Sequence, residues 1–427
     1  MRLFLNRYIV YALLVPALAF FLWRGFFPAL THIDTDFPNY YTAGKIVAEG
    51  NDMTRLYDDA WFQERIYGNG IHQLGKFSPF PPPTALLFVP LSVFEPMTAL
   101  RIMTIINLLL LISAVFLLSR SVGLTIAEAT LLVLLAGVGL VNCFRFGQLY
   151  IALSTSIIAG YYWHRRGKQL LAGVSFGLLA AIKYLPMVFV MYFLFRRQWK
   201  LVAAAAATVS VIWIASIGIM GWNIHEQFFS SVAWQHLSSN LSMQDPFSAI
   251  FQTWDSLFRR LFIYDEVRNP SPILVSSSSY YLAKGLVIAV VIGLTIFVIS
   301  TIQRSGNSDR DSLAVAILTL CALLVAPATA TYHFVLLWLP SALLLKFFVE
   351  SKRRGLFWFS FCTYAAIGII PYSLVRQFDG AGLATILAYP RLFLVCCLFL
   401  AGIAGALRLP ETARASDHAL HGVSTGT

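Results

Sequence analysis

The stretch Asp34-Thr35-Asp36-Phe37-Pro38-Asn39-Tyr40-Tyr41 marks the point where the first long apolar run of the chain gives way to polar sequence. The run before it, about residues 8–30, is long enough to cross a bilayer as a helix. A polar, aromatic-rich loop then extends to about Lys76, and eight of the chain's 20 acidic residues lie in it or, for Glu95, beyond it. Most of these carboxylates are expected to be simply solvated. Asp36, placed between a helix end and an aromatic run, is expected to have a function.

The composition is typical of a multi-pass membrane protein. Of 427 residues, 58% are hydrophobic and 12% are charged, and the mean hydropathy is +0.72, whereas soluble domains carry about 25% charged residues. Apolar runs of about twenty residues without strict alternation favour helices over barrel strands. We therefore expect an all-α bundle of about 10–12 transmembrane helices with outer-face loops. Residues 1–407 are predicted to form a single domain, and residues 408–427 a disordered cytoplasmic tail.

The net charge of +11 indicates a membrane orientation and not a nucleic-acid partner, because the basic residues cluster at the ends of apolar runs. The positive-inside bias places the N-terminus inside and the segments 31–77 and 222–278 outside. The positions expected inside are 165, 197, 305 and 353. By the same reasoning Asp36, Gln148 and His333, which are distant in sequence, all fall on the outer face.

Two segments are predicted to deviate from regular spans. The prolines of Phe77-Ser78-Pro79-Phe80-Pro81-Pro82-Pro83 predict a rigid extended elbow, and the following apolar piece, 84–94, is too short to span. Residues 169–195 have basic flanks on both sides, and Lys183 and Pro186 interrupt them. Two short helices that enter and return are therefore expected there, and such breaks are tolerated where they line a cavity.

Several short motifs occur in a specific order. They are Asp36-Phe37-x-x-Tyr40-Tyr41 with Gly50 and Tyr57, the proline elbow, Phe146-Gly147-Gln148, Ala172-Gly173, Lys183-Tyr184-x-Pro186, Arg196-Arg197-Gln198-Trp199, and Ala326-Pro327 leading to Tyr332-His333. Together they resemble the polyprenol-phosphate-mannose-dependent alpha-1,2-mannosyltransferases, which are integral membrane enzymes of the glycosyltransferase C superfamily. The resemblance covers about residues 1–350 and depends on the ordered set, because each motif alone is weak.

This resemblance implies a glycosyltransferase C-type helical bundle in the cell membrane, with its active site on the extracytoplasmic side. It implies transfer of a hexose, expected to be mannose, from a polyprenyl-phosphate donor to a hydroxyl of a lipid or glycan acceptor, with Asp36 as the general base. The elbow has Ser78-Pro79-Phe80 where the family commonly has Tyr-Pro-Pro, and the later motif is Ala326-Pro327-Ala328-Thr329-Ala330. These departures leave the sugar and the acceptor unspecified.

The chemistry of such a transfer needs only one carboxylate. An acceptor hydroxyl that attacks the sugar C1 loses its proton to a base within hydrogen-bond reach, while the phosphate leaves without an acid but needs cationic or hydrogen-bonding partners. Direct displacement inverts the anomeric centre, so the two-carboxylate scheme of glycoside hydrolases does not apply. Asp34 is the rival base, or alternatively a helix cap; the resemblance selects Asp36.

The other candidates are interpreted as substrate contacts. Lys183 is an ionisable residue within an apolar stretch and is expected to bind the donor phosphate, unless it merely extends to the membrane interface. Tyr40 and Tyr41 are expected to stack on the sugar or line the donor groove, or else to be ordinary interfacial aromatics. Further candidates for phosphate or sugar contacts, each with an ordinary structural alternative, are Asp34, Arg145, Gln148 and His333.

No cofactor or metal is predicted. The five cysteines lie in or beside apolar runs without zinc spacing, and neither a P-loop nor a dinucleotide fingerprint occurs. The expected partners are therefore the lipid-linked donor, the acceptor and membrane lipids. Two alternatives to an enzyme remain open, namely a transporter of lipid-linked glycans and a non-catalytic membrane scaffold. Donor turnover would exclude both.

Overall fold

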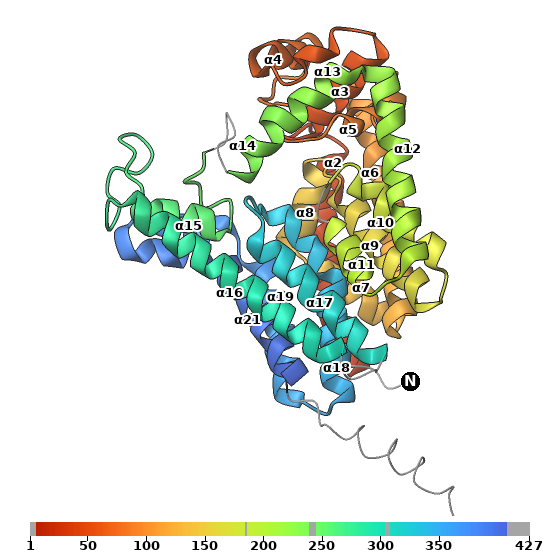
Figure 1. The fold of residues 1–427 in the computed structure, drawn as a ribbon, viewed down its shortest axis with the longest axis vertical. Coiled ribbons are helices and arrows are strands. Elements are labelled where there is room, and N and C mark those ends of the chain that lie inside the picture. Colours follow the sequence, from red (N-terminus) through yellow and green to blue (C-terminus); the bar gives the residue numbers. More distant parts are fainter. Residues whose placement is uncertain (1–5, 184–185, 239–244, 304–307, 408–427) are drawn as a thin grey trace, which may run out of the picture.

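The computed structural model of the chain describes residues 6–183, 186–238, 245–303 and 308–407 (Figure 1). Regular structure in these segments is helical, and the only β pairing found there is an isolated bridge between Asp265 and Asn269. The predicted all-α fold is thus confirmed. The predicted disordered tail, residues 408–427, lies outside the described residues.

Six described helical segments are long and apolar enough to cross a membrane, or up to eight if two bent pairs each count as one span. The six are α1–α2 (Arg7–Ala29), α6 (Pro96–Val122), α12 (Trp199–Met220), α16 (Ser277–Gln303), η5–α18 (Thr331–Glu350) and α21 (Pro390–Leu407). The bent pairs are α7 (Ile126–Leu134) with α8 (Val138–Arg145) and α19 (Arg354–Ile369) with Tyr372–Phe378. The chain is therefore a multi-pass membrane protein. Two further apolar helices, α10 (Gln169–Ala180) and Asp311–Val325, are too short for this criterion.

The two bent spans touch at a pair of glycines. Gly137 lies between α7 and α8 with φ +53°, and a Cβ placed on it would lie 2.2 Å from the carbonyl oxygen of Gly368 in α19. A Cβ on Gly368 would lie 1.9 Å from the carbonyl oxygen of Leu135. Glycine is required at both positions because the two backbones are in direct contact. This contact holds α8 against α19.

The predicted interruption around Lys183 is present. α10 ends at Ala180, and α11 (Met187–Phe195) begins directly after Pro186. Proline is well suited to a helix start, because the N–H that it lacks would have no intrahelical partner there. The interruption leaves Lys183 outside both helices, just after the C-terminal end of α10. α10 itself packs beside α9 (Tyr150–Arg165) and α12.

The polar segment after the first span is a folded cap and not an open loop. α3 (Phe37–Ala48) is buried along most of its length and packs on α4 (Asp59–Gly68) and α5 (Pro83–Leu86). These helices enclose a core of their own, to which α13 (Trp222–Gln227) contributes Ile224. Figure 1 shows α13 lying against this cap. The two segments predicted outside, 31–77 and 222–278, therefore pack on each other.

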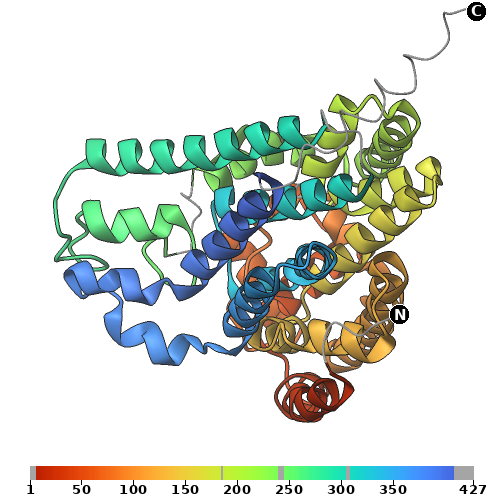
Figure 2. The same ribbon diagram turned by 90° about the horizontal axis from the view of Figure 1, so that it is seen from below.

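The second of these segments also contains a buried charge cluster. Figure 2 shows α15 (Trp254–Phe262) beside α16 at one edge of the molecule. Asp255 accepts hydrogen bonds from Arg259 at 2.8 Å and from Tyr280 at 2.5 Å, and it also pairs with Lys284. Two cations thus compensate one buried carboxylate, and the cluster anchors α15 on α16.

The glycine contact provides a stability test. In Gly368→Ala, a methyl group must displace the Leu135 backbone, and such overpacking costs about 1–3 kcal/mol. We expect a clear fall in the thermal unfolding temperature of the purified protein in detergent. Gly355→Ala in the same helix is the control, because a Cβ there meets nothing within 4 Å. Equal unfolding temperatures for the two variants would show that the α8–α19 contact is not as close as described.

Candidate active site

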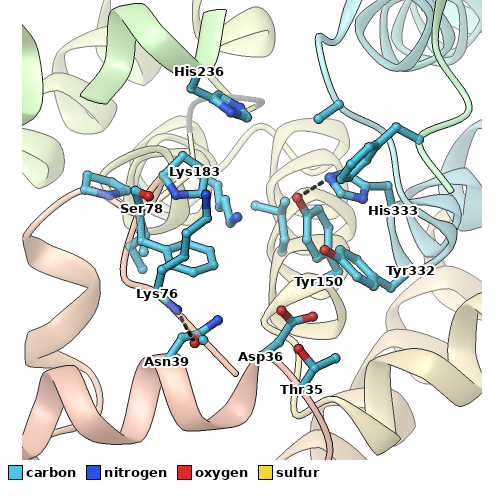
Figure 3. Close-up of a pocket in the computed structure, with 18 of the residues that line it drawn as sticks. Thr35, Asp36, Asn39, Lys76, Ser78, Tyr150, Lys183, His236, Tyr332 and His333 are labelled. Atoms are coloured by element: carbon cyan, nitrogen blue, oxygen red, sulfur yellow. Dashed lines mark hydrogen bonds between the residues drawn. The ribbon is translucent and has the colours of Figure 1, made fainter. Parts of the chain in front are cut away.

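A cavity of about 370 Å³ opens where the cap meets the membrane bundle. Its walls come from the start of α3, the segment 74–81 that runs into the proline elbow, the start of α9, the end of α10, α14 (Ala233–Leu237) and the turn that begins η5. Figure 3 shows the polar side chains converging on this space from both sides. Those with ionisable or hydroxyl groups are Asp36, Lys76, Tyr150, Lys183, His236, Tyr332 and His333, with Thr35 and Ser78.

Asp36 occupies an unusual backbone conformation. Its φ is 72° and its ψ is −48°, and the Phe37 N–H bonds the Thr35 carbonyl at 3.0 Å across it. This is a γ-turn of the strained hand, which a non-glycine residue rarely adopts. Such conformations cost on the order of 1–3 kcal/mol and concentrate at functional sites. Although Asp36 precedes α3 in the N-cap position, its side chain makes no capping bond. Its carboxylate lines the cavity instead.

Two buried side chains behind Asp36 fix its carboxylate. The Gln148 amide donates to Asp36 Oδ2 at 2.5 Å, and the Tyr40 hydroxyl donates to Gln148 Oε1 at 3.0 Å. The Tyr40 bond determines which end of the Gln148 amide faces Asp36. Gly147 has φ +60°, and a Cβ on it would lie 2.9 Å from Phe37 Cβ. A glycine is therefore needed for the Phe146-Gly147-Gln148 turn to approach the start of α3.

The environment raises the pKa of Asp36 to about 6. Burial is the main cause, because it disfavours the charged carboxylate. The hydrogen bond from Gln148 and the positive charge of Lys183 act in the opposite direction and limit the rise. The carboxylate is therefore mostly ionised at neutral pH, yet more basic than an exposed aspartate.

Cationic groups occupy the side of the cavity opposite Asp36. The Lys183 Nζ lies 4.3 Å from the ring centroid of Phe80 and 5.2 Å from that of Tyr150. Lys76 is positioned by its backbone N–H, which donates to Asn39 Oδ1 at 2.9 Å. Burial together with the charges of Lys183 and Lys76 lowers the pKa of His236 to about 4, so this imidazole is neutral at pH 7. The combination of ammonium groups with neutral hydrogen-bonding side chains suits an anionic ligand.

Among the residues that the sequence singled out, Asp36, Lys183 and His333 line the cavity, and Gln148 and Tyr40 support Asp36 from behind. The other three are placed elsewhere. Asp34 and Arg145 form a half-exposed salt bridge of 2.6 Å with each other, and the Tyr41 hydroxyl donates to the Phe94 carbonyl at 2.8 Å. These three side chains do not line the cavity within the described part of the chain.

Three residues that line the cavity were not predicted as site residues from the sequence. Tyr150 follows the Phe146-Gly147-Gln148 turn by two residues, and Lys76 directly precedes the proline elbow. His236 lies in a segment rich in histidine and tryptophan and carried no further signal. Proximity to a recognised motif was thus the only available indication for Tyr150 and Lys76.

No group of three or more His, Cys, Asp or Glu residues suited to hold a metal ion is found among the described residues. Within the same residues, Asp36 is the one carboxylate that lines the cavity. Independence from metal remains a prediction.

Comparisons with known proteins find relatives of the chain. The chain is similar to a polyprenol-phosphate-mannose-dependent alpha-(1-2)-phosphatidylinositol mannoside mannosyltransferase of Mycobacterium tuberculosis, with 26% identity over 216 residues, which are 50% of this chain and 44% of the relative. It is similar to the Mycolicibacterium smegmatis protein of the same name, with 25% identity over 230 residues, which are 53% of this chain and 47% of the relative. The chain thus covers less than half the length of each relative. No solved structure matches it significantly.

The family model of glycosyltransferase family 87 matches residues 79–329. The matched region is more than half of the chain and contains Gln148, Tyr150 and Lys183, while Asp36 precedes it and His333 follows it. On this match, the chain belongs to glycosyltransferase family 87.

Proposed function

We propose that this protein transfers mannose from a polyprenyl-phosphate-mannose donor to a hydroxyl of a lipid or glycan acceptor, with inversion at C1 and Asp36 as the general base. The observation that carries the proposal is the cavity in which a buried carboxylate faces a cationic wall. Family membership and the names of the two mycobacterial relatives support the sugar and the type of donor.

Asp36 supplies the proton acceptor in this proposal. The acceptor oxygen attacks C1, the bond between C1 and the phosphate oxygen breaks, and the phosphate departs with the electron pair. Asp36 takes the proton of the attacking hydroxyl. A base works best when its pKa is close to the operating pH, and the raised pKa of Asp36 moves it in that direction.

Lys183 and Lys76 stabilise the departing phosphate in this proposal. Both ammonium groups approach the cavity from the side opposite Asp36, as Figure 3 illustrates. This separation keeps the negatively charged carboxylate away from the negatively charged phosphate, so the two groups do not repel each other strongly. A leaving group that gains negative charge in the transition state is stabilised by preplaced cations, because they need no reorganisation.

We propose that the cavity opens to the extracytoplasmic side. α9 begins at the cavity and, as a helix of 16 residues, extends about 24 Å to the basic loop that follows Arg165. At this far end Tyr161 hydrogen-bonds Ser312 at 2.7 Å, and Asp311, the residue before Ser312, pairs with Arg196 at 3.1 Å. Basic loops face the cytoplasm, so the opposite end, with the cavity, faces outward.

Cysteine labelling tests this orientation. In a variant without the native cysteines, Glu64→Cys in α4 is expected to react with a membrane-impermeant maleimide in intact cells. Arg354→Cys, at the start of α19, is expected to react only after permeabilisation. Both native side chains are exposed, so accessibility within the protein is matched. The reverse labelling pattern would contradict an extracytoplasmic site.

Asp36→Asn tests the chemical role. The amide keeps the shape of the carboxylate but takes no proton, and general-base catalysis contributes about a hundredfold to ten-thousandfold. We expect kcat of the purified enzyme with a polyprenyl-phosphate-mannose donor to fall by about this factor, while donor binding persists. Asp34→Asn is the matched control, because its half-exposed salt bridge is worth about 1 kcal/mol or less. Near-normal turnover by Asp36→Asn would place the base on another residue, and donor binding without turnover by the wild-type protein would favour a transporter.

The pH dependence tests the environment of Asp36. The ionised form is the active one, so kcat/KM is expected to be maximal above about pH 7 and to fall about tenfold per pH unit below the Asp36 pKa of about 6. Gln148→Leu removes a hydrogen bond that lowers this pKa, so its acid limb is expected at higher pH. Tyr40→Phe keeps that bond but frees the amide, and a smaller shift in the same direction is expected. An acid limb that stays in place in Gln148→Leu would mean that another group titrates.

A further inference from the structure

Tyr150 and His333 form a buried hydrogen-bonded pair on the wall of the cavity. The Tyr150 Oη lies 2.5 Å from the His333 Nε2. Tyr150 begins α9, and His333 lies in η5 (Thr331–Leu337), so the pair joins two elements far apart in sequence. Either atom can act as the donor at this distance. The other nitrogen of the imidazole decides which one does.

The His333 Nδ1 accepts a hydrogen bond from the backbone. The Ala330 N–H donates to this nitrogen at 3.1 Å. Ala330 is buried, and a buried backbone N–H needs a partner. The Ala330 carbonyl is also 3.2 Å from this nitrogen and accepts the backbone N–H of His333 at 3.0 Å, but a proton on Nδ1 would deprive the buried Ala330 N–H of its acceptor. Nδ1 is therefore the unprotonated nitrogen, and the imidazole carries its proton on Nε2.

This tautomer sets the direction of the hydrogen bond to Tyr150. Nε2–H donates, and the Tyr150 oxygen accepts. The Tyr150 hydroxyl proton is therefore not donated to His333. Figure 3 shows Tyr150 and His333 on one side of the cavity and Lys183 on the other. An anionic oxygen attracted by Lys183 would thus come to lie within the space that Tyr150 lines.

We propose that Tyr150 donates a hydrogen bond to a non-bridging oxygen of the donor phosphate, and that His333 is the positioning residue that holds the Tyr150 hydroxyl in this role. The inference rests on the proposed function, since it names a contact of the same donor. As the bond between C1 and the phosphate oxygen breaks, the phosphate gains negative charge and the O–H···O⁻ bond strengthens. Donation from His333 polarises the Tyr150 hydroxyl and makes it a better donor.

The test compares two lipids that differ only in the phosphate. Binding of polyprenyl phosphate and of uncharged polyprenol is measured on the purified full-length protein. Tyr150→Phe keeps the ring and removes the hydroxyl, so polyprenyl phosphate is expected to bind about ten- to hundredfold more weakly while polyprenol binds as before. Because the contact strengthens as the phosphate leaves, kcat is expected to fall by about a hundredfold or more.

Two further variants separate a role in phosphate binding from a structural one. Tyr161→Phe removes a hydroxyl from the same helix at the end away from the cavity, and it is expected to leave the preference for polyprenyl phosphate unchanged. His333→Phe is expected to weaken this preference through Tyr150. The double variant with Tyr150→Phe should then be no worse than Tyr150→Phe alone, because residues that act as one unit are not additive.

The outcomes distinguish this inference from the proposed function. If the wild-type protein prefers polyprenyl phosphate, and Lys183→Met loses the preference but Tyr150→Phe keeps it, the inference is overturned and the donor site stands. If the wild-type protein binds both lipids alike, the donor site itself fails. Additive effects of His333→Phe and Tyr150→Phe would refute the positioning role of His333.

Discussion

The burial of one negative charge is the constraint on which the site depends. Transfer of a carboxylate from water into a protein interior is costly unless hydrogen bonds and nearby cations compensate it. Asp36 has both kinds of compensation, a hydrogen bond from Gln148 at 2.5 Å and the positive charge of Lys183. These two interactions do not fully offset the effect of burial, so the pKa of Asp36 stays raised, at about 6. The same balance makes the carboxylate ionised at neutral pH and still inclined to take a proton.

The fold provides this compensation by joining the cap to the membrane bundle. Asp36 belongs to the cap, whereas Gln148 and Lys183 belong to the turns at the ends of α8 and α10. Two close contacts at glycines bring these parts near enough for side chains to meet. Gly147 allows the turn after α8 to approach Phe37, and Gly137 with Gly368 holds α8 against α19. Close packing at these glycines thus sets the distance over which the charges interact.

The polar groups of the cavity divide into two functions that would interfere if they were mixed. A base must stay ionised next to an uncharged hydroxyl, and a phosphate must be surrounded by donors and cations. In the proposed mechanism Asp36 serves the first function, while Lys76 and Lys183 serve the second from the opposite wall. By contrast, the buried Asp255 is fully compensated by Arg259 and Lys284, as expected for a structural cluster.

Composition and apolar periodicity were sufficient to predict a helical multi-pass membrane protein, because lipid leaves the backbone few alternatives to a helix. The sequence also indicated the break at Lys183 and, through ordered motifs, the family. It did not reveal the cap as a folded unit, since the buried start of α3 is rich in aromatic and polar residues, which are also common in loops.

The partnerships within the site were decided by the tertiary structure alone. Asp34 and Asp36 are neighbours of the same residue type, yet the first pairs with Arg145 at the surface and the second faces the cavity. Tyr150 and His333 are 183 residues apart, and nothing local marks them as a pair. From the sequence alone it follows which residue types are present and that the chain crosses the membrane several times as helices. Which side chains meet depends on how distant helices pack, because hydrogen bonds and charge interactions act over a few ångströms in space and are independent of separation along the chain.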